Sequence, residues 1–222
     1  MEFIFMLTQA DRTVANCLEV LDEIAPLGLR AVGFKDVGAP PATLRRLNER
    51  IKALGARSYL EVVATSPEAM LHSARVAVEI GVDHLLGGTM VAETLALLRG
   101  TAIGYYPFPG LPVGHPTRLG GDAPLIEAQT RAFIAQGCAG VDLLAYRATQ
   151  AEPLALVRAA RQGCGTAGRL ICAGDVDSPA RIKALRAAGA DGFTVGSAAF
   201  AGRFAPQAQG LAAQLKEILS CV

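Results

Sequence analysis

The sequence of 222 residues predicts an α/β fold, a single-domain (β/α)8 barrel of the TIM type that takes up residues 1–222. Short apolar segments alternate strictly with helical segments, and this order demands a parallel sheet. Eight units of about 28 residues each suit a compact barrel. The rival is an open doubly wound sheet, which needs a glycine-rich turn after its first strand. The turn here is TQADRT, which contains no glycine.

The predicted strands are short and rich in Val, Ile and Leu, as expected of strands that are buried on both faces. The first is FIFMLTQ (3–9), and each later strand follows a glycine that can end the preceding helix. The later strands are AVGF (31–34), SYLEVV (58–63), DHLL (83–86), AIGYY (102–106), GVDLLAY (140–146), LICAG (170–174) and DGFTVG (191–196).

Helical segments follow the strands, and several begin at residues that favour a helix start. Eight helical patterns are present when PQAQGLAAQLKEILS (206–220) is included. The predicted starts are Thr13 before VANCLEVLDEI, Pro40-Pro41 before ATLRRLNERIKAL, Ser66-Pro67 before AMLHSARVAVEI and Ser178-Pro179 before ARIKALRAA.

Composition excludes several classes of function. The net charge is +1 with 18% charged residues and no basic patch, so we expect no nucleic-acid partner and no binding to an anionic membrane. No apolar run approaches the roughly 18–20 residues that span a bilayer, and MEFIFMLTQADR does not resemble a signal peptide. Five cysteines without a CxxC pair indicate reduced thiols in a cytoplasmic protein, and the three His form no metal-ligand pattern with them. The oligomeric state stays open, with a homo-oligomer allowed.

The active site of such a barrel lies at the carboxyl ends of its strands. In AVGFKD the bulky Val32 and Phe34 share one face, so Lys35 should point into the barrel. The same alternation in SYLEVVA turns Glu61 inward on the neighbouring strand. We therefore expect Lys35 and Glu61 to face each other near the barrel mouth, as an acid/base pair, a Schiff-base lysine beside a carboxylate, or a structural ion pair.

Further polar residues follow other strands: Gln9 after the first, Arg147 after the sixth and Asp175 after the seventh. One connection is much longer than the rest. It runs from Tyr106 to Asp122 and carries His115 and Arg118. A long loop at this end of a barrel is usually a lid or a substrate wall, and a solvated surface loop is the alternative. Gln9, Arg147, His115 and Arg118 are candidate substrate-binding residues.

The last strand ends in Gly196-Ser197 and turns at once into a helical run, which fits either a plain helix cap or an anion site. The stretch LICAGDVDSPARIKALRAAGADGFTVGSAAF resembles the last two units of the ribulose-phosphate-binding barrel superfamily. That superfamily includes the indole-3-glycerol-phosphate synthase and N-acylmannosamine-6-phosphate epimerase types. The resemblance covers roughly residues 169–202 and implies that Gly174, Gly196 and Ser197 hold a substrate phosphate.

The chain also departs from those families. Ala173 stands where one expects Gly, or Glu in the epimerases, and Asp175 adds a carboxylate to the turn. The catalytic lysine of the epimerases lies on strand 3, where this chain has Glu61. The strand 2 pattern of indole-3-glycerol-phosphate synthase is missing. The resemblance therefore implies a phosphorylated ligand and does not specify a reaction.

The sequence thus predicts an enzyme for a small phosphorylated, sugar-like metabolite. Isomerisation or epimerisation by proton transfer next to a carbonyl is the first expectation, with Lys35, Glu61 and Asp175 as catalytic residues and no cofactor or metal. In this scheme Glu61 is the base and Lys35 stabilises an enolate. The alternatives are a Schiff-base aldolase or lyase that uses Lys35, an FMN-binding oxidoreductase, and a non-catalytic barrel that binds a phosphate ligand.

Overall fold

Eight parallel strands form one sheet in the computed structural model, which describes residues 1–114 and 116–222. The strand order is β10-β11-β12-β1-β4-β5-β6-β7. The bounds are β1 (Glu2–Met6), β4 (Ala31–Lys35), β5 (Arg57–Glu61), β6 (His84–Leu86), β7 (Gly104–Tyr106), β10 (Gly140–Leu143), β11 (Arg169–Cys172) and β12 (Gly192–Val195).

The two ends of this sheet meet, so that the sheet closes into the predicted barrel. The N–H of Ala139 donates to the carbonyl of Tyr105 at 2.9 Å, and the N–H of Asp142 donates to the carbonyl of Pro107 at 3.0 Å. These bonds join β7 to β10. The first and last strands are neighbours, with Phe3 opposite Phe193. The prediction of a single closed (β/α)8 barrel is confirmed.

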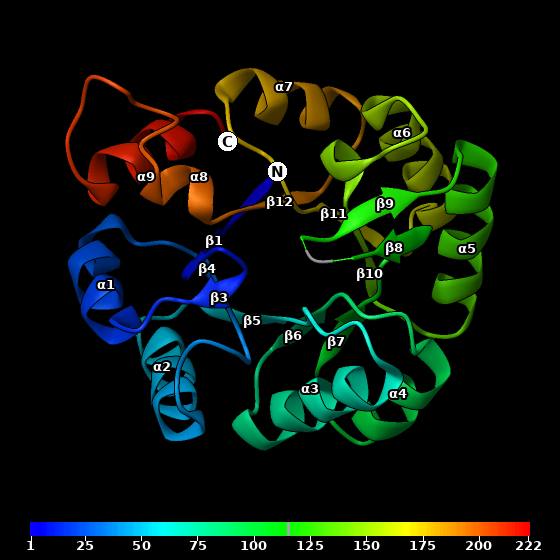
Figure 1. Cartoon of the computed structure of the whole chain (residues 1–222), viewed down its shortest axis with the longest axis horizontal. Helices are drawn as coiled ribbons and strands as arrows, with labels where there is room; N and C mark the ends of the chain where they lie inside the picture. The colour runs from blue at the N-terminus through cyan, green and yellow to red at the C-terminus, as the bar shows by residue number, and fades with distance from the viewer. Residues whose placement is uncertain (115) are drawn as a thin grey trace.

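Helices surround the strands as a ring (Figure 1). The longer ones are α1 (Cys17–Ile24), α2 (Pro41–Ala53), α3 (Pro67–Ile80), α4 (Val91–Leu98), α5 (Ala123–Ala135), α6 (Pro153–Cys164), α7 (Pro179–Ala187) and α9 (Leu211–Ser220). Short helical turns are η1 (Ala25–Leu27), η2 (Ala145–Arg147) and α8 (Ser197–Phe200). In the part of the chain that the structure describes, none of these helices has the length and apolar character needed to cross a bilayer.

Two hairpins interrupt the regular alternation. β2 (Thr8–Gln9) pairs with β3 (Arg12–Thr13) directly after β1, and β8 (Leu111–Val113) pairs with β9 (Arg118–Gly120) after β7. The second hairpin lies within the long connection that runs from Tyr106 to Asp122, and its residue Leu119 is fully buried. Ala148 joins Leu119 in a short parallel bridge, which anchors the hairpin beside η2.

The predicted helix starts are confirmed except for one. The hydroxyl groups of Ser66 and Ser178 accept hydrogen bonds from the N–H groups of Ala69 and Arg181, so both serines cap their helices. The assignment of Thr13 as a cap was wrong. It lies in β3, and α1 begins at Cys17, four residues later.

The core has two layers, as the alternation of strand side chains requires. Val32, Phe34, Leu60 and Val62 belong to the large cluster between strands and helices. A smaller cluster fills the barrel interior, and it consists of Ile4, Met6, Ala31, Tyr59, Leu86, Tyr106 and Ile171. The faces predicted for the second and third barrel strands are therefore correct.

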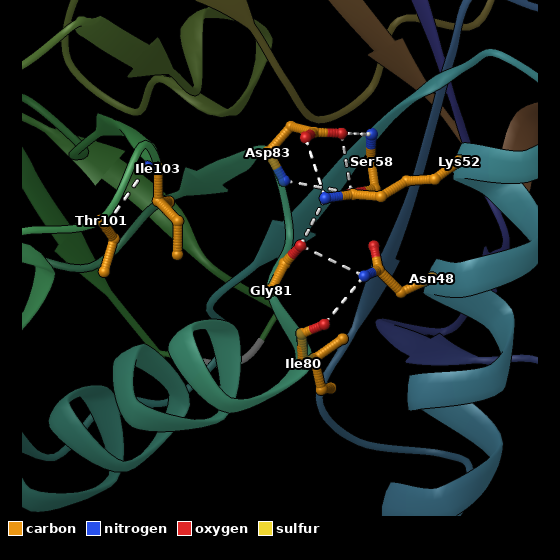
Figure 2. A network of polar contacts seen from close by, with 8 residues as sticks. All are labelled: Asn48, Lys52, Ser58, Ile80, Gly81, Asp83, Thr101 and Ile103. Atoms are coloured by element: carbon orange, nitrogen blue, oxygen red, sulfur yellow. Dashed lines mark hydrogen bonds and ion pairs between the residues drawn. The ribbon is translucent and has the colours of Figure 1, made fainter.

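A polar network ties α2 to the amino-terminal ends of β5 and β6, opposite the end where an active site belongs (Figure 2). The amide of Asn48 donates to the carbonyls of Ile80 and Gly81 at 2.9 and 3.2 Å. Lys52 donates to the same carbonyl of Gly81 and pairs with Asp83 at 3.0 Å. Gly81 ends α3 with φ of 74°, so the network fixes the turn that leads into β6.

We expect Asn48→Ala to lower the free energy of unfolding by about 1–3 kcal/mol, because the carbonyl of Ile80 loses the Asn48 donor and the carbonyl of Gly81 keeps only Lys52. Asn48 is 2% exposed. The matched control is Asn16→Ala, since Asn16 is exposed and its side chain makes no capping bond to α1. Urea unfolding of both variants measures the difference. An equal, small change in both would show that the Asn48 bonds contribute nothing.

Candidate active site

Lys35 and Glu61 lie opposite each other in the register of β4 and β5, as the alternation predicted. The Nζ of Lys35 is 3.5 Å from Oε2 of Glu61. The two residues are only 3% and 9% exposed. Burying a charged pair costs several kcal/mol unless further contacts compensate, so this pair needs additional partners or a functional reason.

Asp11 is the additional partner, and sequence reasoning missed it. Its Oδ1 accepts from Nζ of Lys35 at 2.6 Å. The hairpin of β2 and β3 turns through Ala10 and Asp11 alone, with φ of 46° and 58°. A two-residue turn with both φ values positive normally carries Asn-Gly or Asp-Gly, so Ala-Asp gives no hairpin signal. The hairpin brings the Asp11 carboxylate over Lys35.

Thr13 fixes the backbone of Lys35. Its hydroxyl donates to the carbonyl of Lys35 at 2.7 Å and accepts from the N–H of Lys35 at 2.8 Å. Both bonds are buried. The hairpin of β2 and β3 therefore contacts Lys35 twice. Asp11 bonds its side chain, and Thr13 holds its backbone at the end of β4.

These residues share one pocket of about 420 Å³ with the turns after β11 and β12. Of the residues predicted from sequence, the structure brings together Lys35, Glu61, Arg147, Gly174, Asp175, Gly196 and Ser197. Lys35 and Glu61 are buried, whereas Asp175 and Ser197 are exposed. The pocket therefore runs from a buried ion pair to two solvent-facing turns.

Both turns depend on glycine. Gly174 has φ of +75°, and a Cβ there would lie 2.6 Å from Nε of Arg147. At Gly196 a Cβ would lie 2.7 Å from the hydroxyl of Thr8 and 3.1 Å from Cβ of Met6. Each turn thus packs backbone closely against a neighbour on the pocket wall, which only glycine allows.

Two arginines that were not predicted, Arg181 and Arg203, also line the pocket. They pair with the two oxygens of Asp177 at 3.1 and 3.2 Å. Arg181 also donates to the carbonyl of Asp175 and lies over the ring of Tyr146, 4.6 Å from its centroid. Both arginines therefore stand beside the glycine turns.

Arg147 and Asp175 connect the two ends of the pocket. Nε of Arg147 is 3.5 Å from Oδ1 of Asp175, and its Nη1 is 3.9 Å from Oδ2 of Asp11. The carboxylate of Asp175 thus faces Arg147. In all, the pocket is lined by four cations and four carboxylates, which leaves no formal net charge: Lys35, Arg147, Arg181 and Arg203 against Asp11, Glu61, Asp175 and Asp177.

The remaining substrate-binding residues predicted from the sequence are Gln9, Arg118 and His115. Gln9 is exposed and stands opposite Arg12 in the first hairpin, and Arg118 is exposed on β9. Neither lines the pocket. His115 is outside the described residues. No described residue of the hairpin of β8 and β9 lines the pocket either, so its roles as lid or substrate wall remain predictions.

Asp142 is the most unusual residue near the site, and sequence reasoning passed over it. It lies in the middle of β10 and is fully buried. Burial, followed by the negative charge of Glu61, holds the pKa of Asp142 well above its usual range, while Lys35 and Arg147 act in the opposite direction. The sequence signal was a lone Asp inside the apolar strand GVDLLAY. Among the described residues, no three His, Cys, Asp or Glu side chains are grouped to hold a metal ion.

Comparison with known proteins identifies the fold. No family model and no curated protein matches the chain. A solved structure of 3-hexulose-6-phosphate synthase matches all of this chain and all of its own, with a TM-score of 0.70 and 16% identity. Orotidine 5'-phosphate decarboxylase from Pyrococcus horikoshii OT3 matches 99% of this chain and 98% of its own, with a TM-score of 0.64 and 14% identity.

Thiamine phosphate pyrophosphorylase from Pyrococcus furiosus matches 99% of this chain and 94% of its own, with a TM-score of 0.63 and 12% identity. An aldolase matches 89% of this chain and 90% of its own, with a TM-score of 0.64 and 14% identity. The expected resemblance is therefore confirmed at the level of the fold: the chain is a TIM barrel that is similar to these enzymes over nearly its whole length.

Proposed function

We propose that the protein is an enzyme that acts on a small phosphorylated, sugar-like metabolite by proton transfer next to a carbonyl group. One observation carries the proposal. The buried pair of Lys35 and Glu61 shares a single pocket with the turns at Gly174 and Gly196-Ser197. This arrangement fits a ligand whose phosphate binds at the turns and whose carbonyl group lies beside the buried pair.

The turns supply the phosphate end. Backbone N–H groups at glycine turns are donors for an anion, and Arg181 and Arg203 stand beside them with charge to neutralise a phosphate. Both arginines are held by Asp177, which a bound phosphate would partly replace as their partner. Three structural neighbours are named for phosphate esters, and this supports a phosphorylated ligand.

The buried pair supplies the chemistry. The Glu61 carboxylate accepts a proton from the carbon next to the carbonyl, and the C–H electron pair becomes the double bond of an enolate. The negative charge develops on the carbonyl oxygen, where the Lys35 ammonium stabilises it. Return of the proton to the former carbonyl carbon gives isomerisation when the hydroxyl group on the carbon that lost its proton gives its own proton to the former carbonyl oxygen and becomes the new carbonyl. Return of the proton to the other face of the same carbon gives epimerisation.

A Schiff-base aldolase or lyase is the second candidate, because Lys35 is buried and one structural neighbour is an aldolase. A Schiff base requires a neutral amine. Lys35 instead lies between the carboxylates of Asp11 and Glu61, so its side chain would have to leave both ion pairs before it could attack a carbonyl. Borohydride treatment with phosphorylated aldoses and ketoses distinguishes the two. We expect no adduct, and a trapped adduct on Lys35 would favour the lyase.

Exchange with solvent tests the proton transfer itself. A panel of three- to six-carbon aldose and ketose phosphates is incubated with the protein in D₂O, and the C–H signal next to the carbonyl is followed by proton NMR. We expect at least one compound to lose that signal with the wild-type protein and to keep it with Glu61→Gln. Loss of the signal at equal rates in both proteins would exclude Glu61 as the base.

A further inference from the structure

Two buried threonines, Thr8 and Thr194, form part of the pocket wall. They are only 5% and 6% exposed. Within the described residues neither hydroxyl group makes a hydrogen bond, and neither oxygen is fully enclosed. A buried hydroxyl group without a partner costs free energy, and a valine of the same shape would avoid that cost. The two hydroxyl groups are therefore best explained by a ligand that bonds to them.

Both side chains point into the barrel, as the alternation of strand side chains requires. Phe193 and Val195 pack between strands and helices, so Thr194 between them faces the interior. Its neighbour in register on β1 is Ile4, which belongs to the interior cluster. Thr8 continues the alternation from Ile4 along the chain and lines the pocket. Both hydroxyl groups therefore stand on the inner wall of the pocket.

Thr8 lies between the glycine turn and the buried ion pair. The strands β12, β1 and β4 are neighbours in that order. On the β12 side, a Cβ at Gly196 would lie 2.7 Å from the hydroxyl oxygen of Thr8. On the β4 side, Thr8 pairs with Thr13, whose hydroxyl group holds the backbone of Lys35. A ligand that reaches from the turn at Gly196 to Lys35 therefore passes over Thr8.

We propose that Thr8 and Thr194 bind sugar hydroxyl groups that lie between the phosphate and the carbonyl group of the substrate. This inference rests on the proposed function and narrows its substrate class. A threonine hydroxyl group both donates and accepts hydrogen bonds, which matches a sugar hydroxyl group. The substrate then carries at least one hydroxyl group on a carbon between the two reacting carbons and the phosphate ester. A sugar phosphate of four or more carbons has such a carbon, and a triose phosphate has none.

Two unreactive ligands test the proposal by binding alone. Ribitol 5-phosphate and pentyl phosphate share the chain length and the phosphate group, and they differ only in the hydroxyl groups. We expect titration calorimetry to show at least tenfold tighter binding of ribitol 5-phosphate, because a site built for hydroxyl groups rejects an analogue without them. Equal binding of the two ligands would overturn the proposal. If neither ligand binds, the phosphate site of the proposed function fails, and this inference fails with it.

The variants Thr8→Val and Thr194→Val assign the effect to the two hydroxyl groups. Each should weaken the binding of ribitol 5-phosphate about three- to tenfold and leave that of pentyl phosphate nearly unchanged. The matched control is Thr130→Val on α5. The hydroxyl group of Thr130 also lacks a partner among the described residues, but Thr130 does not line the pocket. The control should bind both ligands as the wild type does. If Thr8→Val and Thr194→Val weaken both ligands equally, or neither, the threonines do not recognise hydroxyl groups.

Thermal unfolding of the ligand-free protein separates recognition from a structural role. Removal of a buried hydroxyl group that has no partner costs no hydrogen bond. We therefore expect the Tm of Thr8→Val and of Thr194→Val to equal or exceed that of the wild type. A lower Tm in both variants would overturn the proposal, because the hydroxyl groups would then serve the fold.

The D₂O exchange panel distinguishes this inference from the proposed function. We expect the compounds that exchange to have four to six carbons, and triose phosphates to be inert. Exchange of triose phosphates as fast as that of longer sugar phosphates would overturn the hydroxyl site and still support the proposed function. Absence of exchange in every compound would contradict the proposed function, while the calorimetric comparison would still decide whether the threonines bind hydroxyl groups.

Discussion

Glu61→Gln is expected to lower kcat by a factor of about 10² to 10⁴, the range that general-base catalysis contributes. Glutamine keeps the shape of the side chain and cannot accept the proton. It also removes one of the two carboxylates that pair with Lys35, while Asp11 remains at 2.6 Å. Lys35 therefore keeps a partner, and the fold should survive. Steady-state kinetics on whichever sugar phosphate exchanges in D₂O measures the effect.

Two further variants separate catalysis from packing. Lys35→Met keeps a long unbranched side chain and removes the charge that stabilises the enolate. We therefore expect a loss in kcat similar to that of Glu61→Gln. Glu93→Gln is the matched control, because Glu93 is exposed on α4 and does not line the pocket. If Glu61→Gln and Lys35→Met change the stability of the protein and leave kcat unchanged, the two residues form a structural ion pair and take no part in catalysis.

Ser197→Asp is expected to abolish measurable binding of phosphate esters. A carboxylate about 4 Å from a phosphate near the protein surface costs up to about 4 kcal/mol per unit charge. Even half of that, about 2 kcal/mol, weakens binding roughly thirtyfold. Ser197 is exposed at the start of α8, where an aspartate is tolerated, so the variant should fold. Titration calorimetry with inorganic phosphate measures the loss.

Ser66→Asp is the control for that experiment. Ser66 caps α3 after the strand β5, at the same end of the barrel, and does not line the pocket. Aspartate is as good a cap as serine. Binding should persist in Ser66→Asp. If both variants bind phosphate as tightly as the wild type, the anion site lies elsewhere, with Arg118 or Arg147 as candidates.

The fold and the pair of Lys35 and Glu61 could be predicted from the sequence because both depend on patterns of neighbouring residues along the chain. Alternation along β4 and β5 is enough to turn Lys35 and Glu61 inward, and adjacent parallel strands place them opposite each other. Gly174 and Gly196 could be predicted because each stands at the end of a predicted strand, and because the last third of the chain resembles known phosphate-binding units. The contacts that exclude a Cβ at both positions are long-range and are visible only in the structure.

Asp11 and Asp142 were missed for different physical reasons. Asp11 reaches Lys35 through a hairpin turn that lacks the usual glycine, so its conformation is visible only in three dimensions. Asp142 lies in mid-strand, whereas residues of a barrel active site are expected at the ends of strands. Conversely, Gln9 and Arg118 lie near strand ends in sequence, and the two hairpins carry them away from the pocket.

A crystal structure of the protein with ribulose 5-phosphate bound tests the central claim most directly. The account predicts that the phosphate lies about 3 Å from backbone N–H groups at Gly174 and at Gly196 or Ser197. It also predicts that the carbonyl lies beside Lys35 with the adjacent carbon facing Glu61. A phosphate bound outside these turns, or a carbonyl turned away from Lys35 and Glu61, would contradict the account.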